Sequence, residues 1–300
     1  MKPAPFDYYA PTSVEQALGH VAQLGYDAKI LAGGQSLIPT MNFRLAQPSA
    51  LIDLNNIAEL FYIRPNDDGG VLIGAMTRQS AVERDPLIAQ RSPLVRAAMP
   101  FIAHPQIRTR GTFGGSIAHA DPAAELPVAT VALGARYRVR NKVGERWITA
   151  EEFFVSLFTT LLQPDELLVE IALPPMPRRS GWSFKEVARQ SGAFGLVGVA
   201  TVVTLDDNKR CQQARMVFLS CGEKPMLATH AAKTLVGQLP TPEAIRAAAE
   251  TAAKDDVDLS SDIHASADYR RHLVKVLAVR ALTEAFDRAN LESPISVRRP

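Results

Sequence analysis

The sequence has little cysteine. Cys211 and Cys221 are the only two cysteines in 300 residues, and no Cys-x-x-Cys pair or histidine cluster accompanies them. Two thiols are too few to hold an iron–sulfur cluster or a structural zinc ion. His104 and His119 also lack a further ligand at metal-binding spacing, so we predict no metal site. Any redox carrier in this chain must therefore be organic.

The sequence also lacks an excess of charge and a long apolar run. Its 33 basic and 31 acidic residues leave a net charge of +2, and no long Lys/Arg run is present. This balance argues against a nucleic-acid groove or an anionic membrane surface. Apolar runs such as residues 197–205 are far shorter than the roughly 20 residues that cross a bilayer, so no membrane span is predicted. Because residues 1–6 lack the apolar core of a secretory signal, we expect a cytoplasmic location.

Helix and strand patterns alternate in the first part of the chain. The run Ser13-Val14-Glu15-Gln16 is a capping box that opens an amphipathic helix, and Gly25 closes this helix. Short apolar strands are predicted at 29–31 and 51–54, and the first of them runs directly into a glycine turn. A strand at 71–74 begins a second unit. The order of these elements predicts an α+β protein.

The rest of the chain continues in the same mixed manner. The second unit is expected to contain helices around 79–83 and 87–99, a helix from Asp121-Pro122 to Gly134, and strands at 136–140, 147–148 and 167–173. The proline-rich stretch 174–179 separates two kinds of patterning. We therefore predict domains at 1–176, with subdomains of about 1–57 and 58–176, and at 177–300. The second domain is expected to have strands at 182–187, 196–205 and 214–219, then helices near 227–235, 242–253 and 269–289.

Two glycine-containing segments carry the chemistry that the sequence predicts. The first is Ala32-Gly33-Gly34-Gln35-Ser36, directly after a strand, and the second runs from Thr109 to Ser116. A dinucleotide cofactor brings a pyrophosphate that backbone N–H groups must meet, and glycine lets the backbone approach it closely. Neither segment fits the GxGxxG or GxxxxGK[ST] spacing, which argues against a Rossmann nicotinamide site and a P-loop ATPase. Since a Gly-Gly pair is also common in ordinary turns, the residues alone leave both interpretations open.

Longer strings around these glycines resemble a known family. AGGQSLIPTMNFRLAQP (32–48) and TRGTFGGSIAHADPAAELP (109–127) are similar to the FAD-binding medium subunits of molybdenum hydroxylases, the carbon monoxide dehydrogenase and xanthine dehydrogenase family. FKEVARQSGAFGLVGVA (184–200), LSCGEKP (219–225) and DIHASADYRRHLV (262–274) follow in the order that this family shows. The resemblance therefore covers nearly the whole chain.

The resemblance implies a fold and a cofactor site. The expected fold is a vanillyl-alcohol-oxidase-type (PCMH) FAD-binding domain of two α+β subdomains, followed by a C-terminal domain with a three-stranded antiparallel sheet and helices. FAD is held noncovalently in this family. Matched residue by residue, the expected cofactor-binding positions are Ile30, Leu31, Ala32, Gly33, Gly34, Gln35, Ser36, Leu37, Ile102, Gly111, Thr112, Gly114, Gly115, Ser116, Asp121, Glu125, Leu168 and Lys185.

Several of these residues have an ordinary structural alternative. Ile102 and Leu168 would look the same as core residues, and Lys185 lies in a strand-like stretch where an exposed lysine is common. Glu125 also fits an acid in the first turn of a helix, where it complements the helix dipole. Asp121 also fits the N-cap of the helix that is predicted to follow it.

The resemblance further implies a role as an electron-transfer subunit of an oxidoreductase. Substrate would be oxidised at the molybdenum cofactor of a large partner subunit, and electrons would pass 2Fe–2S clusters on a small partner before reaching FAD and an external acceptor. A dimer of such heterotrimers is expected, and no residue of this chain needs to be catalytic. Many relatives have an acidic residue where Ala193 stands, so a side-chain contact to the flavin edge is in doubt there. The alternatives are a stand-alone FAD oxidase or reductase of the same fold and a scaffold without cofactor.

Overall fold

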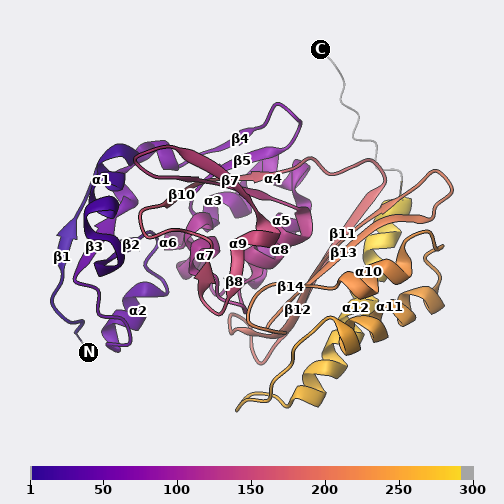
Figure 1. The fold of residues 1–300 in the computed structure, drawn as a ribbon. Coiled ribbons are helices and arrows are strands. Elements are labelled where there is room, and N and C mark those ends of the chain that lie inside the picture. Colours follow the sequence, from indigo (N-terminus) through magenta and orange to yellow (C-terminus); the bar gives the residue numbers. More distant parts are fainter. Residues whose placement is uncertain (1, 292–300) are drawn as a thin grey trace.

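The N-terminal unit is a small parallel sheet covered by one helix. The structure, a computed structural model, describes residues 2–291 (Figure 1). Its first sheet has the order β1-β3-β2 with all neighbours parallel: β1 is Asp7–Tyr9, β2 is Ala28–Leu31 and β3 is Ala50–Asp53. Helix α1, Val14–Leu24, begins where the Ser13 hydroxyl accepts a hydrogen bond from the Gln16 N–H, and Gly25 caps its end. The N-cap at Ser13 and both predicted strands are thus confirmed, whereas the Gln16 side chain accepts from the Thr12 N–H and not from that of Ser13.

The second unit is built on a five-stranded antiparallel sheet. Its order is β4-β5-β10-β6-β7, with β4 Ile63–Pro65, β5 Val71–Gly74, β6 Arg136–Arg140, β7 Glu145–Thr149 and β10 Leu167–Leu173. Every residue of the central strand β10 is buried, as a strand covered on both faces requires. Its one carboxylate, Glu170, is satisfied by Arg64, Arg138 and the Tyr62 hydroxyl. The strands predicted at 71–74, 136–140, 147–148 and 167–173 are therefore confirmed.

Short helices and one hairpin connect and cover this sheet. They are α3 Gln79–Arg84, α4 Pro86–Arg91, α5 Pro93–Ala98, α6 Pro105–Arg110, α7 Phe113–His119, α8 Glu125–Leu133 and α9 Ala150–Phe153, with the hairpin of β8 Phe154–Ser156 and β9 Thr159–Thr160. Helix α8 is apolar on nearly all sides and lies in the middle of the molecule (Figure 1). A helix that is hydrophobic all round belongs in a core.

Two sequence predictions in this region were wrong in detail, and one helix of the first unit was not predicted. The single helix expected over 87–99 is divided, because α4 ends at Ser92 and Pro93, which has no N–H to donate, opens α5. The helix expected from Asp121 begins only at Glu125, because the Asp121 carboxylate accepts from the Ala123 N–H and caps a separate turn. Helix α2, Leu37–Asn42, follows the first glycine segment and was not predicted.

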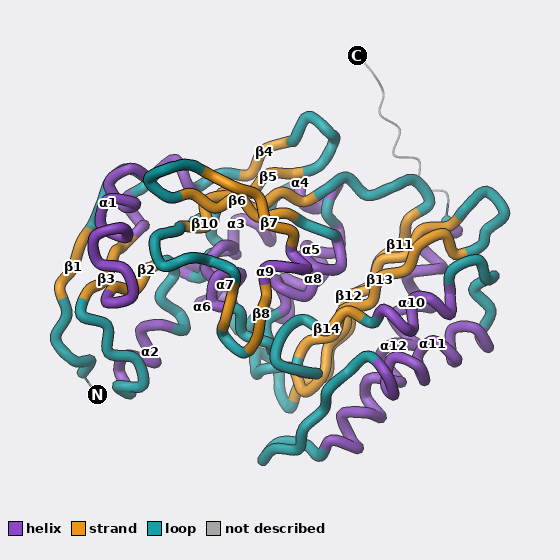
Figure 2. The backbone as a smooth tube through the Cα atoms, viewed as in Figure 1, coloured by secondary structure: helices purple, strands orange, loops and turns teal. Residues whose placement is uncertain are grey.

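The C-terminal part is an antiparallel sheet between two cores. Strands β11 Ser180–Ala188, β12 Gly195–Leu205 and β13 Cys211–Leu219 follow one another, and the two-residue strand β14, Met226–Leu227, adds a short edge to the three that were expected. Helices α10 Thr229–Leu235, α11 Pro242–Asp255 and α12 Ala267–Asn290 cover one face (Figure 2). On the other face, Phe184, Ala200 and Val217 belong to the core that contains α8. The expected α+β fold with its two parts is confirmed.

None of the helices between residues 2 and 291 is long and apolar enough to span a membrane.

Candidate cofactor site

The fold brings the two glycine segments into direct contact. A methyl group placed on Gly33 would lie 2.5 Å from the Arg110 carbonyl oxygen and 2.7 Å from the Gly111 Cα atom. A methyl group on Gly115 would lie 3.4 Å from the Cβ atom of Ala32. At Gly33 only glycine permits this approach of two backbones, and the Gly115 contact with Ala32 is an ordinary van der Waals contact. These positions, 77 or more residues apart in sequence, therefore form one site.

The first segment presents a row of free backbone N–H groups. From Gly33 to Leu37, no backbone N–H donates a hydrogen bond to any residue of the described chain. Gly34 adopts φ +73°, a conformation that glycine accepts without strain, and it turns the chain from β2 into α2. Successive unpaired N–H groups in such a turn form a concave donor surface for an anion. The chemistry of this donor set fits a phosphate group.

Side-chain amides hold the carbonyl groups of the same segment. The Gln35 amide nitrogen donates to the Gly33 carbonyl oxygen at 3.0 Å, and the Asn55 amide nitrogen donates to the Ala32 carbonyl oxygen at 3.0 Å. Arg78 donates to the Asn55 side-chain oxygen at 2.5 Å and to the Arg110 carbonyl oxygen at 2.6 Å. Sequence analysis missed Asn55 and Arg78, because neither lies within a glycine motif.

The second segment uses its N–H groups inside the protein. The N–H groups of Phe113 and Gly114 donate to the carbonyl oxygens of Thr77 and Ala75, both at 2.9 Å. The Thr112 hydroxyl caps α7 by accepting from the Gly115 N–H at 3.1 Å. A methyl group on Gly114 would lie 2.6 Å from the Cβ atom of Ala75. This segment is therefore largely a helix start packed against the chain after β5, and not a second open loop.

Gly111 and Ser116 also take part in the packing and hydrogen bonding of this helix start. A methyl group on Gly111 would lie 2.5 Å from the side-chain oxygen of Gln79, and the Ser116 N–H donates to the Thr112 carbonyl oxygen at 3.2 Å. The Thr112 hydroxyl caps the helix and is buried, and Gly111 serves close packing. Their contact with a cofactor stays a prediction.

Two predicted contacts are core residues. Ile102, after a turn of 3-10 helix, and Leu168, in β10, are 7% and 4% exposed and belong to the central hydrophobic core. Ile30 and Leu31, by contrast, are half-buried in β2 where it leads into the first segment. The geometry thus favours the core role of Ile102 and Leu168.

Glu125 is buried and lies near a second, half-buried carboxyl group, that of Glu186. Burial raises the pKa of Glu125 to about 7, and nearby Asp121 adds to the shift, while its own backbone hydrogen bond and Arg108 oppose it. Burial also raises the pKa of Glu186, in β11, to about 8, with repulsion from Glu125 as the second cause. The Glu186 Oε2 atom is buried and has no hydrogen-bond partner in the described part of the chain. Sequence analysis did not single out Glu186, because its partner lies in another domain.

Lys185 forms an ion pair on the C-terminal sheet, and its contact with a cofactor stays a prediction. Its ammonium pairs with Glu284 of α12, which also accepts from the Ser183 hydroxyl at 2.7 Å. Side chains alternate across a strand, so Phe184 and Glu186 face the core that contains α8 while Lys185 faces α12. The lysine therefore lies on the opposite face of the C-terminal sheet.

The two histidines near the second segment take part in packing. A methyl group on Gly192 would lie 2.3 Å from the His104 ring, so the turn that holds Ala193 lies against this histidine. His119 stacks on Phe158 with 5.0 Å between the ring centroids, and burial lowers the pKa of His119 despite nearby Asp121. Between residues 2 and 291, no three His, Cys, Asp or Glu side chains form a group that could hold a metal ion.

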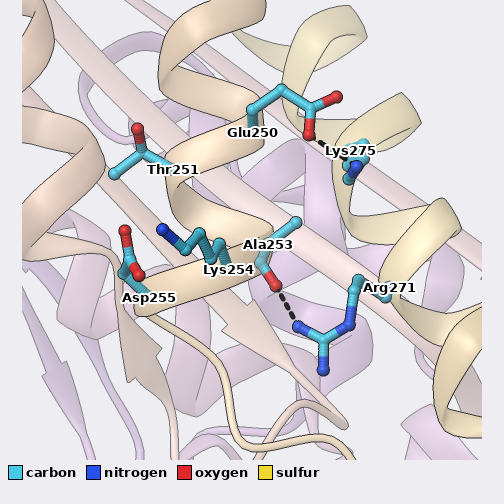
Figure 3. A pocket seen from close by; sticks show the side chains of 7 residues that line it. All are labelled: Glu250, Thr251, Ala253, Lys254, Asp255, Arg271 and Lys275. Carbon is cyan, nitrogen blue, oxygen red and sulfur yellow. Dashed lines mark hydrogen bonds and ion pairs between the residues drawn. The ribbon is translucent and has the colours of Figure 1, made fainter.

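A hollow on the outer helices lies elsewhere. It measures about 500 Å³ between α11 and α12, and an ion pair of Glu250 with Lys275 and a hydrogen bond from Arg271 to the Ala253 carbonyl oxygen cross it (Figure 3). None of its residues belongs to the glycine segments. The hollow therefore offers no cofactor site.

Comparison with known proteins gives the family. The model described as "FAD binding domain in molybdopterin dehydrogenase" matches residues 4–176, and "CO dehydrogenase flavoprotein C-terminal domain" matches residues 182–285. The chain belongs to the flavoprotein medium subunits of the molybdenum hydroxylases. It is thus a subunit of an oxidoreductase with the FAD-binding domain of that family, as the resemblance implied.

Relatives of this medium-subunit family match over almost their full length. The chain is 42% identical to the "6-hydroxypseudooxynicotine dehydrogenase complex subunit alpha" of Paenarthrobacter nicotinovorans, over 96% of this chain and 97% of that protein. A structure of carbon monoxide dehydrogenase from Hydrogenophaga pseudoflava matches with a TM-score of 0.92 and 37% identity, over 96% and 99% of the two chains. Quinoline 2-oxidoreductase of Pseudomonas putida 86 matches with a TM-score of 0.90 and 36% identity, over 96% and 99%. The named substrates differ widely among these relatives.

Proposed function

We propose that this medium subunit holds FAD noncovalently at the two glycine segments and passes electrons from the iron–sulfur clusters of a partner to an external acceptor. The observation that carries the proposal is the row of five free N–H groups from Gly33 to Leu37, at the point where two backbones meet. FAD, when bound, supplies one-electron acceptance and two-electron release. The residues of this chain bind and orient it.

The first segment supplies most of the binding groups in this proposal. Its free N–H groups, together with the Ser36 hydroxyl, meet the pyrophosphate, and Ile30 and Leu31 lead into that surface. The hydroxyls of Thr112 and Ser116 add donors from the second segment. Asp121 and Glu125 stay proposed contacts at its far end, and Lys185 stays a proposed contact from β11. The scheme asks for no nucleophile or general base.

The partners are part of the proposal. The relatives include a "complex subunit alpha" and chains named "medium chain", so they belong to larger assemblies. We propose that a small subunit with 2Fe–2S clusters and a large subunit with the molybdenum cofactor bind this chain, as a dimer of heterotrimers in the cytoplasm. The domain division at residue 176 is proposed with it.

A purification tests the function. The chain is expressed with its neighbouring subunits, recovered through a tag on itself, and examined by its visible spectrum, its co-purifying proteins and the cofactor released by heat. Flavin bands, released FAD and two co-purifying subunits would support the proposal. Turnover of an organic substrate by the chain alone would favour the stand-alone oxidase. A colourless complex that takes up no added FAD would overturn the proposal.

A further inference from the structure

Arg78 touches both halves of the cofactor site without belonging to either glycine motif. We propose that Arg78 is a positioning residue, which through Asn55 and the Arg110 carbonyl holds the two glycine segments in the geometry that presents their N–H groups to phosphate. This inference rests on the proposed function, because it needs FAD at these segments. It deepens that function by naming what shapes the phosphate-binding surface.

The first connection runs through Asn55. Arg78 donates to the Asn55 side-chain oxygen at 2.5 Å, and the Asn55 amide nitrogen donates to the Ala32 carbonyl oxygen at 3.0 Å. The Asn55 amide nitrogen also donates to the Asp53 carboxylate, so Arg78 and Asp53 together fix which end of the amide faces Ala32, because a guanidinium can only donate and a carboxylate can only accept. The Ala32 carbonyl group is held in one direction as a result.

Peptide geometry transmits this direction to the donor surface. In a planar trans peptide, the C=O of one residue and the N–H of the next point to opposite sides. A carbonyl of Ala32 turned toward Asn55 therefore turns the Gly33 N–H away from it. Gln35 acts in the same way one residue later, because its amide holds the Gly33 carbonyl oxygen and so directs the Gly34 N–H.

The second connection runs to the Arg110 carbonyl. The other guanidinium nitrogen donates to this oxygen at 2.6 Å, and it is the same oxygen that would lie 2.5 Å from a methyl group on Gly33. The backbone of Arg78 is also paired with that of Thr112, since the Gln79 N–H donates to the Gly111 carbonyl oxygen at 2.9 Å. Arg78 is thus fixed to the second segment by main chain and side chain while it holds the first.

The charge of Arg78 has no carboxylate partner in the described residues. Its acceptors are a carbonyl and an amide oxygen, and its guanidinium carbon lies 5.5 Å from the centre of the Phe61 ring. Burial lowers the pKa of Arg78, nearby Arg110 adds to the shift, and Asp53 opposes it. An anionic ligand would stabilise a half-buried cation that has no carboxylate within ion-pair distance. The phosphates of FAD supply such charge.

A matched pair of arginine variants tests this role. Arg91 also donates to two backbone carbonyls, those of Gly69 and Gly70 at 3.2 Å, but at a turn outside the cofactor site. The full chain in its complex is freed of FAD, and FAD is titrated back by flavin fluorescence. We expect Arg78→Ala to raise the Kd for FAD about ten- to a hundredfold, the range of hydrogen bonds to a charged group, while Arg91→Ala leaves it unchanged. Arg78→Lys should recover part of the loss, because the ammonium keeps the charge.

The melting temperature of the FAD-free protein separates positioning from simple support. A merely structural role predicts that Arg78→Ala lowers the melting temperature with no change in Kd beyond that of Arg91→Ala, and this result would overturn the inference. If Arg78 acts through Asn55, the double variant Asn55→Ala/Arg78→Ala should raise the Kd for FAD no more than the single variant with the larger effect. If the two residues act independently, their two increases in Kd should multiply. If the unaltered protein itself binds no FAD, the proposed function fails first. If it binds FAD and all variants equal it, only the role of Arg78 fails.

Discussion

The two glycine segments look alike as sequences and act differently in the structure. The first, from Ala32 to Ser36, is half-buried up to the exposed Ser36, and its N–H groups from Gly33 onward have no partner in the described part of the chain. The second, from Gly111 to Ser116, uses most of its N–H groups on its own helix and on the chain after β5. A glycine can thus be required either because a ligand must approach the backbone or because another backbone already does. The hydrogen-bond partners, and not the glycine count, tell the two cases apart.

The largest effect is expected from a methyl group added to the packed second segment. In Gly114→Ala the new Cβ atom would lie 2.6 Å from the Cβ and 2.7 Å from the carbonyl oxygen of Ala75, inside the core. We expect the free energy of unfolding to fall by about 3 kcal/mol, as overpacking does. Urea unfolding of the FAD-free chain measures it. The control is Gly19→Ala, a helical glycine with only the Lys142 side chain at 4.0 Å, which should gain up to about 1 kcal/mol. Equal results for the two would contradict the packing role.

The same change in the open segment should act on the ligand. In Gly33→Ala the methyl group meets the backbone of the second segment, at the Arg110 carbonyl oxygen and the Gly111 Cα atom, so the first segment must move away from it. We expect the Kd for FAD to rise about a hundredfold, together with a lower melting temperature of the FAD-free chain, because the clash is with backbone atoms. Gly144→Ala, where the methyl group meets nothing within 4 Å, is the control and should keep full affinity. Undiminished FAD binding by Gly33→Ala would refute the assignment of this segment.

The carboxyl groups of Glu125 and Glu186 should make the stability of the folded chain depend on pH. The folded-state pKa values of Glu125 (about 7) and Glu186 (about 8) lie above the ordinary 4.5, so the folded protein binds the extra protons. Stability from these groups is therefore full below pH 4.5 and is lost as the pH rises through 7 and 8. In Glu186→Gln, the fall in the free energy of unfolding between pH 4.5 and pH 8 should be smaller by about 1 to 3 kcal/mol, the cost of an unpaired buried polar group. Thermal melts from pH 5 to 9 measure it. A pH dependence equal to that of the unaltered chain would exclude Glu186 as its source.

The smallest expected effect isolates one peptide plane. Gln35→Ala removes the amide that holds the Gly33 carbonyl oxygen. Because one neutral hydrogen bond contributes about 1 kcal/mol, the Kd for FAD should rise about fivefold. Gln163→Ala, which removes an amide bond to the Leu161 carbonyl oxygen far from the site, is the control in the same titration. A Kd that moves equally in both variants would argue against the orienting role of Gln35.

Much of the fold follows from local signals. The helix after Ser13 and the strands on either side of the first segment were predicted because a cap and short apolar runs lie next to each other in sequence. The break before Pro93 carried its own signal, since proline favours the first position of a helix. The later start of α8 did not, because Asp121 looks the same whether it caps a helix or a turn.

The site was predictable only where the motif is continuous. Arg78 and Asn55 are 23 residues apart and meet through the pairing of distant segments, and Glu186 meets Glu125 only across a domain contact. The face on which Lys185 lies depends on strand register, which a one-residue shift would reverse. Such contacts have no local pattern from which to infer them.

The C-terminal sheet has a consequence for how such subunits evolve. Its inner face, with Phe184 and Val217, completes the same core as α8, while its outer face completes a second core with α12. If either part of the chain were replaced by an unrelated domain, one apolar face of this sheet would be exposed to water. The two parts must therefore change together in evolution, because a substitution on either face of this sheet alters a core that the other part shares.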